Sequence, residues 1–124
     1  MSRSELLCGY TASVLRRALD NIEWEIEKLR GEGLAKITSE RLDEYRKILD
    51  YFLSEVDALV NNLHFSCKGI DKEELERLTS WLKVSKEDLK KAFEKKDEKI
   101  LNMARVEIAS MKHHIPTALR RTES

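Results

Sequence analysis

Residues 8–29 read CGYTASVLRRALDNIEWEIEKL, and the spacing of their apolar side chains predicts the fold class. The apolar positions follow one another in alternating steps of four and three, which is the repeat of one stripe along an α-helix. The stripe consists of Cys8, Ala12, Leu15, Leu19, Ile22, Ile26 and Leu29.

A second stretch with the same spacing follows the glycine-containing segment RGEG at 30–33. Thr38 or Ser39 is the expected N-cap of this helix, because a side-chain oxygen there accepts a hydrogen bond from the first turn. Lys68-Gly69 is the expected stop, since glycine adopts the left-handed backbone that ends many helices. The predicted stripe consists of Leu42, Tyr45, Leu49, Phe52, Val56, Leu59 and Leu63.

The second half of the chain predicts a short helix and then a longer helical stretch. Asp71 is the expected N-cap of the short helix, which should end near Lys83 because Ser85-Lys-Glu-Asp88 resembles a new helix start. Apolar residues from Leu89 to Ile115 then keep one helical phase. The charged run EKKDEK at 94–99 is either a turn between two helices or an exposed turn of one long helix.

These patterns predict an all-α protein, an antiparallel helical bundle of three long amphipathic segments plus one short helix over residues 71–83. Pro116 is expected to end the regular structure, because proline lacks the backbone N–H that a helix needs. We therefore expect one domain over residues 1–115 and a flexible basic tail over 116–124.

Additional apolar residues lie beside the main stripes and widen them. They are Tyr10 and Val14 in the first helix, and Ile48 and Val60 in the second. A wide stripe either serves the core of the bundle alone or also leaves a seam for a second subunit. The sequence leaves both open, and a homo-oligomer is the expectation for small helical hairpins.

Composition narrows the class of protein. The chain has 124 residues, 41% hydrophobic and 37% charged, with a net charge of zero. Residues 99–124 form its one basic region, while the rest is slightly acidic. Glutamine is absent, and lysine and glutamate dominate the charges, which is typical of thermophilic proteins. No apolar run approaches the about 20 residues of a membrane span, and no export signal is recognisable, so we expect a cytoplasmic protein.

Both cysteines and all three histidines are expected at one end of the bundle, which raises the question of a zinc site. The closely spaced cysteine pair of most zinc sites is missing. A disulfide is a second alternative, and two reduced, buried thiols are the favoured one, since cytosolic thiols usually stay reduced. The candidate metal ligands are Cys8, His64, Cys67, His113 and His114.

Catalysis has no support in the sequence. A di-iron centre in a helical bundle requires Glu-x-x-His on two helices, and this motif does not occur in the chain. The four glycines are too dispersed to form a phosphate-binding loop. We therefore expect a protein that is not an enzyme and has neither a cofactor nor a small-molecule substrate.

The first functional hypothesis is a protein–protein interaction or assembly subunit that pairs with itself or with another protein. Tryptophan and tyrosine are enriched at binding hot spots. Trp24 lies off the main stripe of its helix, Tyr10 lies beside that stripe, and Trp81 falls at the end of the predicted short helix. These three residues are the candidate partner-binding side chains.

The alternative hypothesis is an accessory nucleic-acid-binding subunit of a nucleoprotein complex. Basic side chains near the C-terminus can hold a few phosphates, and two arginines of the first helix are candidates to extend the patch. No aromatic residue accompanies the C-terminal cluster, so base stacking is not expected. The candidate residues are Lys112, His113, His114, Arg120, Arg121, Arg16 and Arg17.

Overall fold

The structure is a computed structural model that describes residues 3–119, apart from the side chains of Ser4 and Thr117. Every regular element in this part of the chain is an α-helix, and it contains no strand. The all-α prediction is therefore confirmed. The four helices are α1 (Arg3–Glu32), α2 (Ser39–Ser66), α3 (Lys72–Lys95) and α4 (Glu98–Leu119).

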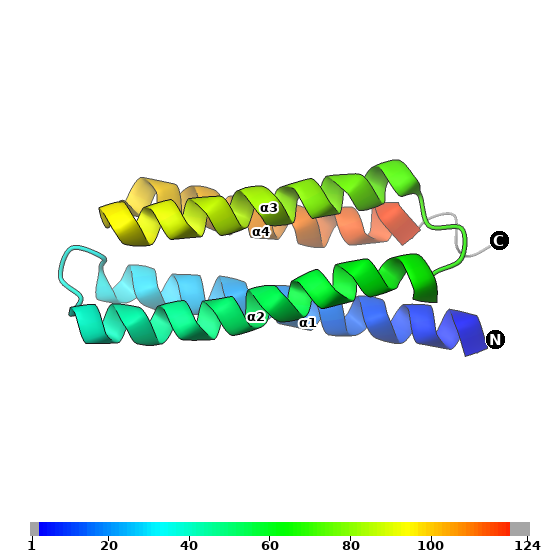
Figure 1. Ribbon diagram of the computed structural model, residues 1–124, viewed down its shortest axis with the longest axis horizontal. Coiled ribbons are helices and arrows are strands. Elements are labelled where there is room, and N and C mark those ends of the chain that lie inside the picture. The colour runs from blue at the N-terminus through cyan, green and yellow to red at the C-terminus, as the bar shows by residue number, and fades with distance from the viewer. Residues whose placement is uncertain (1–2, 120–124) are drawn as a thin grey trace.

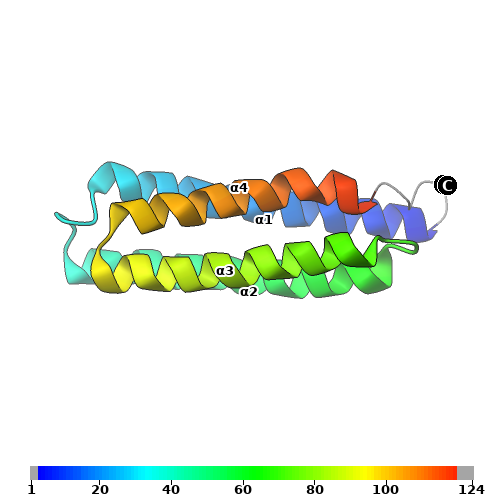
Figure 2. The same ribbon diagram turned by 90° about the horizontal axis from the view of Figure 1, so that it is seen from above.

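The helices pack as a bundle. Figure 1 shows all four lying along one long axis, with the α1–α2 and α3–α4 connections at one end and the α2–α3 connection at the other. Figure 2 shows α1 beside α4 in one layer, over α2 beside α3 in the other. Both α1 and α3 pack against α2 and α4. Each helix therefore borders two others, and the apolar core runs between the four.

The stripe of residues 8–29 is buried along its whole length, as its spacing predicts. In α2 the most buried residues differ from the predicted stripe at two places, because Leu53 and Val60 replace Phe52 and Leu59, which are only partly buried. The reason is that α2 contacts α1 on one side and α3 on the other. A helix between two neighbours buries a band wider than a single stripe.

The predicted starts of α2 and α3 are confirmed by their capping hydrogen bonds. The hydroxyl of Thr38 accepts a hydrogen bond from the backbone N–H of Arg41 at 3.1 Å. The carboxylate of Asp71 accepts from the N–H groups of Glu73 and Glu74 at 3.0 and 3.3 Å. Both caps satisfy first-turn donors that have no partner inside the helix.

The predicted short third helix is wrong, because α3 continues without interruption from Lys72 to Lys95. Ser85 does not cap a new helix; it is buried inside α3, and its hydroxyl donates to the backbone carbonyl of Trp81 at 2.7 Å. This bond to the preceding turn is the usual arrangement for serine inside a helix. The bundle therefore has four long helices instead of three long segments and a short one.

The charged run at 94–99 contains a turn, which resolves the two alternatives left by the sequence. Lys96 adopts a left-handed backbone with φ of 51° and ends α3. The carboxylate of Asp97 then accepts from the N–H groups of Lys99 and Ile100 at 2.8 and 3.3 Å and begins α4. The carboxylate of Glu98 accepts from the backbone N–H of Leu34 at 2.9 Å, which ties this turn to the α1–α2 connection.

The prediction that Pro116 ends the regular structure is also wrong, because α4 includes Pro116 and runs to Leu119. The last turn is held by packing, since Ile115 and Ala118 are fully buried. In addition, the backbone N–H of Asp71 donates to the carbonyl of Ala118 at 3.3 Å. Residues 116–119 of the expected tail thus belong to the bundle, while 120–124 lie outside the described residues. None of the described helices has the length and apolar character needed to cross a membrane.

Candidate interaction surface on α1 and α2

Large apolar side chains are exposed mainly on one half of the bundle. Ten of them are exposed within residues 3–119, and seven of the ten belong to α1 and α2. All four exposed aromatic side chains are in this group, with exposed fractions of 69% for Tyr10, 64% for Trp24, 67% for Tyr51 and 79% for Phe65. The other three of the seven are Leu6, Leu7 and Ile48.

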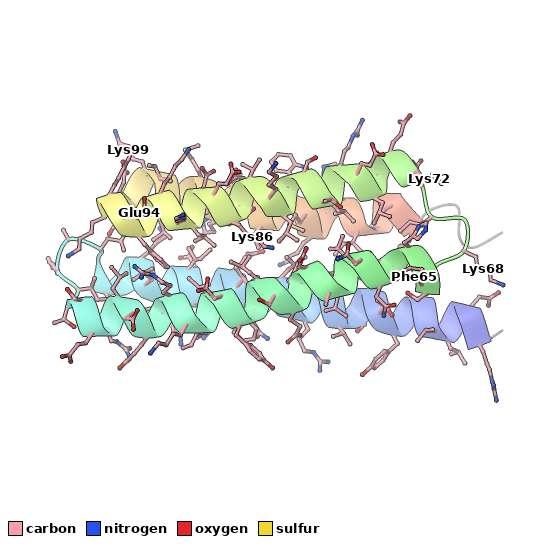
Figure 3. The ribbon with its side chains drawn as sticks, viewed as in Figure 1. Phe65, Lys68, Lys72, Lys86, Glu94 and Lys99 are labelled. Carbon is pink, nitrogen blue, oxygen red and sulfur yellow. A yellow bond between two sulfur atoms is a disulfide. The ribbon has the colours of Figure 1, made fainter. Side chains whose placement is uncertain are left out.

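Helical spacing places these side chains on the surface of the α1–α2 pair that faces away from α3 and α4. At about 100° per residue, Tyr10 and Tyr51 lie nearly opposite the buried stripes of their helices. Trp24 lies at the edge toward α4 and Phe65 at the edge toward α3, where Figure 3 shows it near the end of α2. We call this surface the α1–α2 face. It consists of Leu7, Tyr10, Val14, Arg17, Asn21, Ile48, Tyr51, Glu55, Ala58 and Asn62, with Leu6, Trp24 and Phe65 at its edges.

A disulfide between Cys8 and Cys67 fixes α1 against α2 at one end of this face, with the two Cα atoms 4.8 Å apart. The favoured expectation of two reduced thiols is therefore wrong. Sequence spacing could not reveal the bond, because 59 positions separate the two cysteines and only the packing of α1 on α2 brings them together. At the other end the hydroxyl of Tyr45 donates to the carboxylate of Glu32.

The disulfide and the hydrogen bond between Tyr45 and Glu32 set which residues of α1 and α2 lie at the same height along the bundle axis. Tyr10 comes two residues after Cys8, and Phe65 comes two residues before Cys67. Trp24 comes sixteen residues after Cys8, and Tyr51 comes sixteen before Cys67. Both helices rise by about 1.5 Å per residue, so Tyr10 lies level with Phe65 and Trp24 lies level with Tyr51. The face thus has two pairs of aromatic side chains, about 21 Å apart along the bundle.

Between the aromatic pairs the face carries one cation, Arg17, and one anion, Glu55. Neither has an ion-pair partner within 4.0 Å among the described residues. The seam between α1 and α4 is different, since Lys112 contacts Asp20 at 2.5 Å and Glu23 at 3.0 Å, and Arg105 contacts Glu27 at 3.2 Å. Charges at that seam are satisfied within the chain, whereas those of the α1–α2 face are open to a partner.

Trp81, the third candidate partner-binding residue, is placed differently from Trp24 and Tyr10. It is half-buried against the core, and its indole stacks on the ring of His114 with the ring centres 6.3 Å apart. The Nδ1 atom of His114 lies 3.5 Å from a carboxylate oxygen of Glu74. Trp81 therefore joins α3 to α4 and lies away from the α1–α2 face.

Those candidate nucleic-acid-binding residues that the structure describes do not point in one common direction. Lys112 is held by the two acids of α1, and the hydrogen bond to Asp20 raises its pKa despite the opposing effect of burial. His114 lies on the side of α4 that faces α3, while His113 is exposed. Arg16 and Arg17 are exposed on α1, and Arg120 and Arg121 lie outside the described residues.

The candidate metal ligands do not form a site within residues 3–119. The sulfur atoms of Cys8 and Cys67 are bonded to each other, so neither is available as a thiolate. His64 contacts the ring of Phe65 with centres 5.3 Å apart, and His114 faces Glu74 on α3. No cluster of three or more potential ligands is found in this part of the chain.

A groove of about 610 Å³ lies between α2 and α3, in the half of the bundle near the α3–α4 turn. Its apolar floor is already well covered, since Leu49, Leu53, Leu89 and Phe93 are all buried. The rim carries both signs of charge, including Lys86 and Glu94, which Figure 3 labels. A mixed rim over a closed floor does not select one class of ligand. The residues of the rim are Arg46, Asp50, Ser54, Lys86, Lys90 and Glu94.

Sequence reasoning missed a pair of buried carboxyl groups, Asp88 of α3 and Glu107 of α4. Each has a buried oxygen without a hydrogen-bond partner, Oδ2 in Asp88 and Oε1 in Glu107. Burial, together with the hydrogen bond and the charge of Asp88, raises the pKa of Glu107 to about 8. A signal was present, because Glu107 adjoins the buried Ile108 in the apolar phase of its helix. Within residues 3–119 no group of three or more potential metal ligands includes the pair, and its burial bears on the stability of the bundle.

Comparison of the chain with protein families, with curated proteins and with solved structures gives no match. The inference of function therefore rests on the described residues alone. Among their features, the α1–α2 face combines the most exposed apolar surface with charges that have no partner within the described part of the chain.

Proposed function

We propose that this protein is a non-enzymatic protein–protein interaction or assembly subunit that binds its partner through the α1–α2 face. The observation that carries the proposal is the exposure of four aromatic side chains, each between 64% and 79%, on one pair of helices. Exposed aromatic residues on a soluble protein attract other apolar surfaces, and tyrosine and tryptophan dominate the binding energy of many interfaces.

We further propose that the four helices form one domain in which each helix is antiparallel to the next. The alternation of the connections between the two ends of the molecule supports this arrangement (Figure 1). Such a bundle presents α1 and α2 as a flat, rigid pair, which suits a binding surface because little order is lost on association.

We propose that the protein works in the cytoplasm of a thermophilic microbe. Disulfides are rare in most cytosolic proteins, but intracellular proteins of hyperthermophiles are rich in them. The bond between Cys8 and Cys67 and the abundance of lysine and glutamate support this combination.

The nucleic-acid alternative has no comparable observation in its favour. Lys112, the most central of its candidate residues, already contacts two carboxylates at 2.5 and 3.0 Å. That alternative stays a prediction, which a binding titration can test.

The test of the proposed function is chemical crosslinking in extract of the source cells with added wild-type protein or the double variant Y10D/Y51D. We expect crosslinked species with the wild type, whether with itself or with another protein, and their loss with the variant. M103D is the matched control, since Met103 is an apolar, exposed residue on α4. A wild-type protein that crosslinks to nothing, or a Y10D/Y51D variant that crosslinks as well as the wild type, would contradict the proposal.

A further inference from the structure

We propose that the partner of the α1–α2 face is a second copy of this chain, oriented in the same direction about a two-fold axis parallel to the bundle. This inference rests on the proposed function and names the partner of the same surface. In this dimer α1 of each copy packs on α2 of the other. Because the axis is parallel to the bundle, each residue lies at the same position along the bundle in both copies.

The apolar surface of the face suits such a dimer. Exposed for about two-thirds or more of their area, its four aromatic side chains offer roughly 400–700 Å² of surface. A standard interface buries about 800 Å² per partner, so these side chains with Leu6, Leu7 and Ile48 approach the area that a stable dimer needs. The exposed large apolar residues of α3 and α4, within the described chain, are only Val84, Met103 and Val106, none of them aromatic.

The dimer matches the heights of the aromatic side chains. Tyr10 lies level with Phe65 because both are two residues from the disulfide. Packing α1 on α2 of the second copy therefore places Tyr10 beside the second copy's Phe65. By the same counting Trp24 meets the second copy's Tyr51. The two-fold axis repeats both pairs, which gives four aromatic contacts in all.

The charges of the face decide the direction of the second copy. Arg17 is nine residues after Cys8, and Glu55 is twelve residues before Cys67, so their heights differ by about 4.5 Å. In the proposed dimer Arg17 lies beside the second copy's Glu55, and the axis creates this ion pair twice. Both side chains lack an ion pair within the described part of the chain, which leaves them available to form it.

Reversing the second copy reverses the electrostatic effect. A two-fold axis across the bundle also matches the aromatic heights, because Tyr10 and Trp24 are equally far from Arg17. It packs α1 on α1, however, and brings Arg17 against the second copy's Arg17. Like charges placed together at an interface disfavour that arrangement. The positions of the aromatic side chains permit both orientations. The charges of Arg17 and Glu55 favour the dimer in which the two copies point in the same direction.

The test uses two charge-reversal variants, R17E and E55R, and their mixture. Each variant alone places two pairs of like charges in the proposed dimer, so we expect dimerisation to weaken by about tenfold or more. In the mixture the introduced glutamate of R17E meets the introduced arginine of E55R, and the unchanged Arg17 and Glu55 form the other pair. A heterodimer should therefore form as tightly as the wild-type dimer. Sedimentation velocity at low salt measures both effects, and circular dichroism checks that each variant is helical.

R16E is the control, because Arg16 is exposed on the same helix but points toward the α4 side. We expect it to dimerise like the wild type. An R17E variant that pairs with wild-type protein more tightly than the wild type pairs with itself would indicate the reversed orientation and overturn the proposal. Wild-type protein that stays monomeric also overturns it. The two proposals can fail separately. If the wild type is monomeric but crosslinks to another protein, and Y10D/Y51D loses that crosslink, the dimer is excluded and the proposed function stands. If the wild type forms no crosslink at all, the dimer and the proposed function are both excluded.

Discussion

The carboxyl groups of Asp88 and Glu107 face each other across the seam between α3 and α4, and both are buried without a basic partner among the described residues. Burial, with the hydrogen bond and the charge of Asp88, raises the pKa of Glu107, so Glu107 keeps its proton in this apolar environment. An ionised Glu107 at this seam therefore works against the folded bundle.

The contribution of Glu107 to the free energy of unfolding should fall as the pH rises from about 4.5 to about 8. The unfolded chain loses the Glu107 proton near its ordinary pKa of 4.5, whereas the folded chain keeps it up to a pKa of about 8. The proton therefore stabilises the folded state at low pH, and this contribution disappears as the pH passes the folded pKa. We expect E107Q to be more stable than the wild type by roughly 1–3 kcal/mol at pH 8 and equal to it at pH 4.

Urea unfolding of wild type and E107Q at pH 4, 6 and 8 measures this difference. Subtracting the two free energies of unfolding at each pH removes the pH dependence that the other carboxylates contribute to both proteins. D88N serves as a second variant, because it removes the same repulsion from the other side. A stability difference between wild type and E107Q that is the same at all three pH values would contradict the raised pKa of Glu107.

Removing the disulfide should lower the free energy of unfolding by about 4 kcal/mol, since it closes a loop of 59 residues in the unfolded chain. We expect C8A/C67A to remain helical, because the other core residues of α1 and α2 are unchanged. Urea unfolding of the double variant and of reduced wild-type protein measures the loss. Reduced wild type as stable as the oxidised protein would show that the bond does not constrain the unfolded chain.

The two tryptophans should respond to alanine in opposite ways. W81A should destabilise the protein by about 2–3 kcal/mol, because Trp81 packs on the core and on His114. W24A should change stability by no more than about 0.5 kcal/mol, because Trp24 is exposed, but it should weaken self-association. Thermal unfolding and sedimentation measure the two properties separately. Loss of stability in W24A equal to that in W81A would place Trp24 in the core instead of an interface.

Binding to short RNA and DNA should be weak. The reason is that Lys112, one of the candidate phosphate-binding residues, is paired with Asp20 and Glu23. A titration at low and moderate salt, with a version truncated before Pro116 beside it, tests this expectation. Tight binding that weakens steeply with salt and disappears on truncation would support the nucleoprotein alternative instead.

Local patterns predicted much of the fold. The alternating spacing of Leu15, Leu19 and Ile22 identified α1, and Thr38 and Asp71 marked two helix starts through their side-chain oxygens. These signals are local, because a helix repeats every few residues and its cap contacts only the first turn. The candidate site was partly predicted in the same way, since Tyr10 and Trp24 lie off the main stripe and are exposed.

Signals of the same kind failed where packing overrode them. Ser85 has the sequence context of a helix cap, yet the core position it occupies keeps α3 continuous. Pro116 is a helix breaker, yet burial of Ile115 and Ala118 carries α4 past it. In both cases apolar contacts with other helices outweigh a local preference of about 1–3 kcal/mol.

Local sequence patterns predict that this protein is helical, where its first two helices lie, and which of their side chains avoid the core. The packing of the helices brings Cys8 to Cys67 and Asp88 to Glu107, and it places the aromatic residues of α1 and α2 on one face. The physical reason is the range of the interactions. Helical periodicity acts over a few residues, whereas these contacts join positions far apart in the chain and exist only after the helices have packed.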